Sequence, residues 1–260
     1  MPHVSTLEHA ARGSGAEWQP LSTAEHIDRL AIEGRRLADV VAHSPLDAPV
    51  PGCPGWDVEA LIRHIGDVHR WAALIVGDRA QERLRRDFAG PGDRDSLLTW
   101  YADGHAQLLD VLRDASPDDH FWAWGPAPNP QAFWARRQSH ETAIHRLDAE
   151  QAAGAPTPFP ALAAADGVDE WLVLALRRCR VADGRGRRLH VAANDTPGEW
   201  VVELREDGLS VERRDGRADC SVRASASDLF ALVMNRRDAA GLDVAGDEDV
   251  LRAWRESVRF

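Results

Sequence analysis

The stretch HETAIHRLDAE, at residues 140–150, concentrates side chains that can bind a metal. Its histidines, His140 and His145, are five positions apart, whereas the H-E-x-x-H motif of zinc metalloproteases has them four apart. Glu141 and His145 do stand four apart, and on a helix this spacing places a carboxylate and an imidazole on one face. A catalytic zinc ion takes at least three protein ligands, so this pair needs a third ligand from elsewhere in the chain.

Four amphipathic helices are predicted in the first part of the chain. A four-helix bundle can build a metal site from side chains that face its interior. Apolar residues recur at helical spacing in each segment, and capping residues or prolines mark the ends. The helices are expected from Ser22 or Thr23 to a point before Pro45, from Trp56 through Ile75, over 96–112 and over 131–151.

The pattern changes after Pro160 from helical to mixed. A helix at 162–178 is followed by short segments that alternate apolar and polar residues, with Asp-Gly turns between them. Helical patterns return at 227–235 and 248–258. We predict a flexible tail over residues 1–20, a bundle over 21–155 and an α+β domain over 160–260.

His64 and His69, on the second predicted helix, are the candidates for the third ligand. Periodicity slightly favours His69 as the buried residue, because His64 lies on the flank of the apolar face. An interior histidine held by a hydrogen bond would show the same spacing, so the spacing leaves both open. Other histidines, including His26 and His190, stand near predicted helix ends or on strands without neighbours typical of a metal site.

Asp148 lies one helical turn beyond His145. It could orient the second ring nitrogen of His145, a common role for a carboxylate beside a metal-bound histidine. It could equally pair with a nearby arginine, and a solvated helix carrying a Glu/His pair would show the same pattern.

Composition excludes some classes of protein. A net charge of −11 argues against a general nucleic-acid binder, and no lysine is present, which is typical of a GC-rich genome. Cys53, Cys179 and Cys220 form no C-x-x-C pair, so neither a disulfide framework nor a structural zinc knuckle is indicated. No apolar run reaches the ~18 residues of a membrane helix, and no signal segment is recognised. We expect a cytoplasmic protein with neither a nucleic-acid nor a membrane partner.

Three segments, in this order, resemble actinobacterial proteins related to mycothiol-dependent maleylpyruvate isomerase. They are VPGCPGWDVEALIRHIGDVHRWA, RRQSHETAIHRLDAE and the stretch from Glu199 to Trp254. The resemblance implies an α+β two-domain protein, with an N-terminal DinB-like four-helix bundle and a C-terminal sterol-carrier-protein-like α+β domain. It also implies a metal triad of His64, Glu141 and His145, and so selects His64 over His69.

The implied triad has a definite chemistry. Two neutral imidazoles and one carboxylate leave a zinc ion with one net positive charge and an open position. A thiol that enters this position loses its proton, because the metal stabilises the thiolate. The resemblance implies mycothiol as this thiol, with zinc or another divalent metal in the triad. Attack on an electrophilic small molecule gives cis–trans isomerisation if the thiol is expelled again, and an S-transferase reaction if the adduct is released.

The resemblance further implies an arginine of the C-terminal domain that holds an anionic substrate. The matching region VMNRRDAAGL offers Arg236 and Arg237, and a guanidinium group suits bidentate binding of a carboxylate. A surface arginine would look the same in the sequence.

Two other functions stay open. One is a zinc hydrolase that uses metal-bound water, with Asp67 or Asp148 as its base. The other is a non-catalytic binding protein in which the metal stabilises the bundle. The sequence specifies neither the electrophile, nor the metal, nor the oligomeric state.

Overall fold

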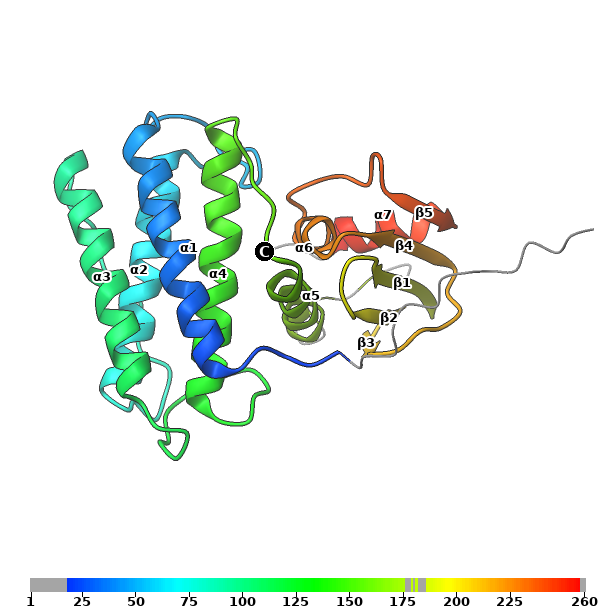
Figure 1. Cartoon of the computed structure of the whole chain (residues 1–260), viewed down its shortest axis with the longest axis horizontal. Coiled ribbons are helices and arrows are strands. Elements are labelled where there is room, and N and C mark those ends of the chain that lie inside the picture. Colours follow the sequence, from blue (N-terminus) through cyan, green and yellow to red (C-terminus); the bar gives the residue numbers. More distant parts are fainter. Residues whose placement is uncertain (1–17, 176–178, 180, 182–185, 258–260) are drawn as a thin grey trace, which may run out of the picture.

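The computed structural model describes residues 18–175, 179, 181 and 186–257. Most of the predicted tail over residues 1–20 lies outside this part of the chain, as do the predicted helix ends at Arg178 and Val258. α1 packs beside α4 and α2 beside α3, as Figure 1 shows at its left. The four bundle helices are α1 (Thr23–His43), α2 (Val58–Gly77), α3 (Arg94–Asp114) and α4 (Pro130–Ala152).

Each bundle helix begins directly after a capping side chain. Ser22 accepts a hydrogen bond from the Glu25 amide, and the Glu25 side chain bonds back to the Ser22 amide, which makes a reciprocal capping box. Asp57, Asp93 and Asn129 each cap the next helix through one side-chain oxygen. Of the two residues predicted to cap the first helix, Ser22 and Thr23, the structure uses Ser22, and the helix begins at Thr23.

In the described part of the chain, the second domain is a five-stranded sheet with three helices. Its strands lie in the order β3-β2-β1-β4-β5, and all neighbours are antiparallel except β1 and β4. The predicted two-domain α+β fold is confirmed. The elements are α5 (Ala161–Ala175), β1 (Arg187–Ala193), β2 (Glu199–Arg205), β3 (Gly208–Glu212), β4 (Cys220–Ala224), α6 (Ala226–Val233), β5 (Asp243–Gly246) and α7 (Glu248–Ser257).

One face of the sheet builds the core of the second domain. Leu189 of β1 pairs with Val202 of β2, and Val191 pairs with Trp200. Residues two apart on a strand point to the same face, so these four side chains enter one core together. No helix in the described part of the chain combines the length and the apolar composition that crossing a membrane would need.

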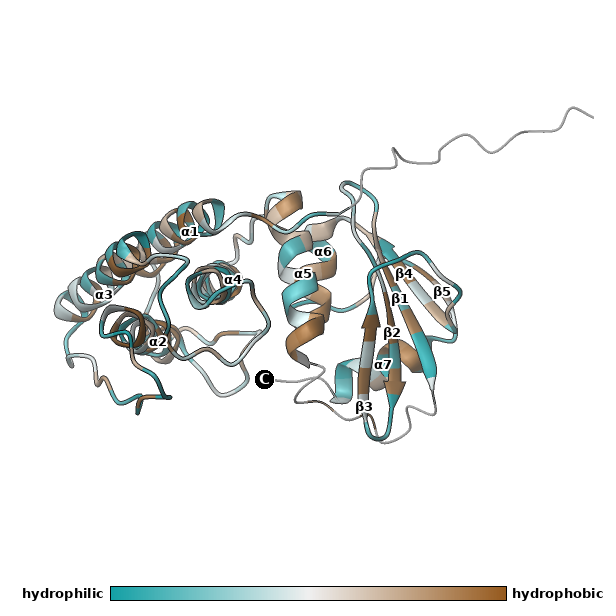
Figure 2. Ribbon diagram, turned by 90° about the horizontal axis from the view of Figure 1, so that it is seen from below, coloured by the Kyte–Doolittle hydropathy of each residue, from teal (hydrophilic) through white to brown (hydrophobic). Residues whose placement is uncertain are grey.

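Both domains pack on α4. α1 and α2 cover it on the bundle side, while α5 and α6 lie between α4 and the sheet, as both views show (Figures 1 and 2). Ala143, Ile144 and Leu147 of α4 belong to the core of the second domain. Much of the rest of α4 is buried and polar, and buried polar groups need partners. α4 can therefore present functional side chains on two sides.

Arg146 of α4 is fully buried and joins three segments. Its Nε donates to Glu33 of α1 at 2.8 Å, and its Nη1 donates to Glu150 at 2.7 Å. The guanidinium group also lies over the Phe159 ring, 4.5 Å from the centroid, and donates to the carbonyl of Thr157. These contacts hold the connector that leaves the bundle against α1 and α4.

Candidate active site

A cavity of about 1700 Å³ lies between the bundle and the second domain. The bundle lines it with α2, α4, the loops that precede them and the loop that follows α2. The second domain adds α5, α7 and the segment that follows α6. Clefts between domains in which polar groups converge are common locations for ligand sites.

Three side chains meet at the bundle wall of this cavity: His64 of α2, and Glu141 and His145 of α4. His64 Nε2 lies 3.4 Å from Glu141 Oε1, and His145 Nε2 lies 3.6 Å from the same oxygen. The three atoms lie within 4.8 Å of one another. The structure thus brings together the three residues that the family resemblance selects.

These separations fit a shared metal ion better than direct hydrogen bonds. Two ligand atoms at about 2.0–2.1 Å from zinc, at the tetrahedral angle, lie roughly 3.3–3.4 Å apart. The observed 3.4 and 3.6 Å match that separation, whereas ordinary hydrogen bonds to oxygen are shorter. Two imidazole nitrogens and one carboxylate oxygen are also a donor set that zinc accepts.

A tight loop before α2 supports the two histidines. The Trp56 amide donates to the Cys53 carbonyl at 3.0 Å, and Gly55 takes a positive φ of 87°, which a glycine adopts without strain. The loop places the Trp56 ring 4.8 Å from that of His64 and 6.0 Å from that of His145. The C-P-G-W stretch therefore forms a rigid wall beside both imidazoles.

Asp148 fulfils both roles that its spacing left open. Its Oδ2 lies 2.9 Å from His145 Nδ1, which leaves Nε2 of that ring toward His64 and Glu141. Arg236 of the second domain donates to both oxygens of Asp148, from Nε at 2.8 Å and from Nη2 at 3.0 Å. Burial would raise the pKa of Asp148, but His145 and Arg236 lower it to about 2.

Opposite charges are held together in the triad. Burial would raise the pKa of Glu141, but the Arg137 guanidinium and the neighbouring imidazoles of His145 and His64 hold it well below its ordinary value. Burial would lower the pKa of His145, but hydrogen bonds with Asp148 and Cys53 and the negative charge of Glu141 raise it well above its ordinary value. A metal that binds His145 therefore displaces a proton.

The two candidate arginines are placed differently. Arg236 lines the cavity and also donates from Nη2 to Cys53 Sγ at 3.3 Å. Arg237 instead pairs with Asp228 and donates to the backbone carbonyls of Asp238 and Ala240. Geometry therefore distinguishes them where spacing could not.

His69 is fully buried, which confirms the periodicity, and it lies apart from the triad. Its Nε2 lies 2.8 Å from the Thr142 hydroxyl, and its ring is 5.5 Å from that of His105. Burial, with a smaller contribution from His105, holds the pKa of His69 well below its ordinary value. It is therefore an interior histidine that stays neutral in the folded protein.

This neutral histidine predicts a pH dependence of stability. Below about pH 6.5 the unfolded chain binds a proton at His69 that the folded chain does not, so the free energy of unfolding falls as the pH falls. His69→Gln should reduce that slope by about 1.4 kcal/mol per pH unit between about pH 6.5 and 5. Urea unfolding at several pH values measures it, with the exposed His120→Gln as control. An unchanged slope in His69→Gln would contradict this assignment.

Comparison with known proteins shows which families the two domains match. Residues 27–150 match the family model of the mycothiol maleylpyruvate isomerase N-terminal domain. The helical bundle of this chain therefore matches that domain family. Residues 174–247 match the SCP-2 sterol transfer family, which agrees with the sterol-carrier-like domain implied by the resemblance.

Solved structures show the same fold over most of the chain. The crystal structures of the mycothiol-dependent maleylpyruvate isomerase and of a histidine-to-alanine mutant of it each align with a TM-score of 0.61. The identity is 14%, over 86% of this chain and 93% of that chain. No curated protein matches the chain. The structural likeness establishes the fold. The activity depends on the residues of the site.

Two residues at the site were not singled out from the sequence. Arg137 donates from Nη2 to Glu141 Oε2 at 2.7 Å. It stands four residues before Glu141, a spacing that predicts a helical ion pair. Cys53 donates to Asp148 Oδ2 at 3.4 Å, and only its place inside the C-P-G-W stretch pointed to it.

Proposed function

We propose that this chain is a metal-dependent enzyme that uses mycothiol to attack an electrophilic, anionic small molecule, in the manner of a maleylpyruvate isomerase. The observation that carries the proposal is the meeting of His64, Glu141 and His145 with Arg236 on one cavity between the domains. The names of the family and of the structural neighbour supply the thiol and the reaction class.

His64, Glu141 and His145 would hold a zinc-like ion. When bound, that ion would favour the thiolate form of mycothiol and so supply a nucleophile at neutral pH. Asp148 keeps the proton of His145 on Nδ1, and Arg137 turns one oxygen of Glu141 away from the histidines. These residues orient the donor atoms before any ligand arrives.

The charge of the cavity favours an anionic substrate. Among the described residues, seven arginines line it against three glutamates. Guanidinium groups bind carboxylates in a bidentate manner, so a small acid would be drawn toward this wall. The arginines are Arg83, Arg85, Arg86, Arg137, Arg236, Arg252 and Arg255.

The hydrolase reading is less well supported. Asp67 forms an ion pair with Arg86 at 2.9 Å and accepts the Phe88 amide at 3.1 Å. Asp148 is fully buried between His145 and Arg236. Both carboxylates that could serve as the base are therefore occupied by structural partners.

Thiol dependence tests the proposal directly. Turnover of unsaturated acids with a C=C conjugated to a carbonyl should require both mycothiol and a divalent metal restored after chelation. Recovery of free thiol with a cis–trans product indicates isomerisation, whereas a stable adduct indicates an S-transferase. Turnover that consumes water and ignores mycothiol would instead establish the hydrolase.

Arg236 should anchor the substrate's anionic group. Arg236→Ala removes a cation from the cavity and should lower kcat/KM on an acidic substrate by about 10- to 100-fold, the usual size of one charged hydrogen bond. Metal content at saturating metal should not change, since all three ligands remain. Arg237→Ala is the matched control and should keep nearly full activity. Full activity in Arg236→Ala would rule out the anchor and leave the metal site untouched.

A further inference from the structure

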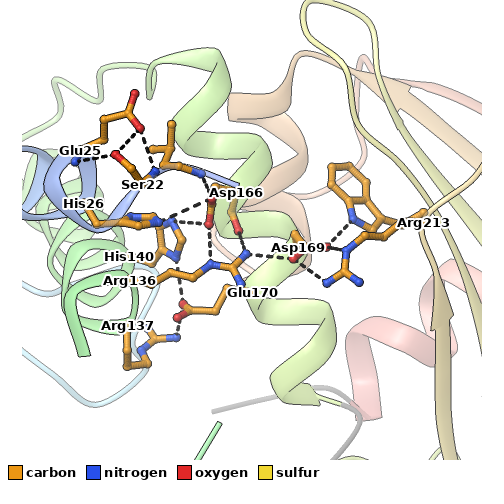
Figure 3. Close-up of polar contacts among 12 residues, drawn as sticks. Ser22, Glu25, His26, Arg136, Arg137, His140, Asp166, Asp169, Glu170 and Arg213 are labelled. Carbon is orange, nitrogen blue, oxygen red and sulfur yellow. Dashed lines mark hydrogen bonds and ion pairs between the residues drawn. The ribbon is translucent and has the colours of Figure 1, made fainter. Parts of the chain in front are cut away.

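A second group of two histidines and one carboxylate lies on the other side of α4. His140 and His145 are five residues apart, so their side chains leave the helix about 140° apart. His140 meets His26 of α1 and Asp166 of α5, as Figure 3 shows. From the sequence, His26 had no neighbours typical of a metal site, and this expectation is wrong because Asp166 is brought to it by packing. His190 likewise meets Glu199 and Asp215, but Asp215 is exposed.

The buried group repeats the geometry of the triad. Its candidate ligand atoms lie within 4.8 Å of one another, as they do in the triad. His26 Nε2 lies 3.6 Å from Asp166 Oδ2, and His140 Nε2 lies 3.6 Å from Asp166 Oδ1. The two histidine rings are 5.2 Å apart, against 5.1 Å for His64 and His145.

In both groups, a carboxylate lies beside Nδ1 of the α4 histidine. His140 Nδ1 lies 2.9 Å from Glu170 Oε2, just as His145 Nδ1 lies 2.9 Å from Asp148 Oδ2. Such a carboxylate holds the proton on Nδ1 and leaves the lone pair of Nε2 for another partner. In this group that lone pair faces His26 and Asp166.

Three nitrogens of this group have no hydrogen-bond partner within the described part of the chain. They are both ring nitrogens of His26 and Nε2 of His140. The side chains of His26, His140 and Asp166 are buried, with 2%, 3% and 0% of each residue exposed. At 3.6 Å the histidine–carboxylate contacts are too long for hydrogen bonds, and orphaned buried polar atoms call for a bound water or ion.

Asp166 can serve such an ion without losing its other partners. Its Oδ2 accepts the Leu21 amide at 2.7 Å, and its Oδ1 accepts Nε of Arg136 at 2.5 Å. Each carboxylate oxygen has two lone pairs, so one on each remains. With the two Nε2 atoms this makes four donor atoms, a mixed N/O set that suits zinc better than calcium or magnesium.

We propose that His26, His140 and Asp166 form a second, structural site for a zinc-like divalent ion. The ion would join α1 and α4 of the bundle to α5, at the point where the chain passes between the domains. Its burial separates it from the cavity, so it would hold the packing of the three helices and take no part in turnover. The proposal does not depend on the proposed enzyme activity.

Metal counting and anomalous scattering test the second site together. Full-length protein is stripped with a chelator, saturated with zinc, desalted and analysed by elemental mass spectrometry. We expect about two zinc ions per wild-type chain, about one in His26→Gln and about one in His145→Ala. Crystals of the wild-type protein measured at the zinc absorption edge should show one peak at each group, and this needs no variant to fold.

The outcomes separate the two sites. A wild-type count of about one, with a single anomalous peak among His64, Glu141 and His145, would overturn the second site and leave the triad intact. An unchanged zinc count in a folded His26→Gln variant would overturn it as well. Three results together would establish the second site. One zinc ion remains in His145→Ala, one is lost in His26→Gln, and an anomalous peak lies between His26 and Asp166.

Discussion

Replacing His145 with alanine should abolish metal binding at the triad and lower mycothiol-dependent turnover by at least about a thousandfold. Two ligands do not make a catalytic zinc site, and a metal typically supplies several kcal/mol of stabilisation to the reaction it assists. His145 also contacts the buried Asp148 and the partly buried Glu141, so its loss leaves both carboxylates without this imidazole.

The measurement pairs metal content with activity. The zinc content of His145→Ala should fall by about one ion per chain, in step with turnover. His120→Ala, at an exposed position outside the cavity lining, should change neither quantity. Substantial turnover in metal-free His145→Ala would show that the thiol is activated by other groups, and the proposed chemistry would be wrong.

Replacing Arg146 with alanine should destabilise the protein by about 3–5 kcal/mol, because it leaves buried carboxylates without their cation. Glu33 and Glu150 are almost fully buried, and both lie within 2.9 Å of the Arg146 guanidinium nitrogens. The variant also loses the contact with the Phe159 ring. The connector between the domains should loosen with it.

Urea unfolding measures the loss, and Arg36→Ala is the matched control. Arg36 also reaches Glu150, at 2.9 Å, but its side chain is 36% exposed. An ion pair with so exposed a partner contributes no more than about 1 kcal/mol. Equal losses in the two variants would mean that Glu150 does not depend on Arg146, and the burial argument would fail.

Helical periodicity predicted the bundle and brought two of the three triad residues together. The four-residue spacing of Glu141 and His145 placed both on one face of α4, as the structure shows. The same reasoning favoured His69 over His64, because periodicity finds buried positions and His69 is the buried one. A residue that faces a cavity lies on the flank of the apolar face and stays partly exposed, as His64 does. Family resemblance, rather than spacing, selected it.

Contacts between distant segments were beyond the reach of the sequence. Arg236 meets Cys53 across 183 positions, and nothing in the local pattern of either residue indicates the other. Asp166 sits on an apolar helix, and it is fully buried against His26 and Arg136. Such pairs are decided by how the domains pack on α4, which no single-helix pattern contains.

The Arg236–Asp148–His145 chain links two equilibria. Arg236 belongs to the second domain, and Asp148 and His145 to the bundle, so docking of the domains and orientation of the metal ligand share one hydrogen-bonded path. An ion that prefers the oriented imidazole also favours docking of the domains. By thermodynamic reciprocity, metal binding strengthens the docking by the same factor by which docking strengthens metal binding. Loading with metal should therefore slow amide hydrogen exchange in the segment after α6, far along the chain from any ligand.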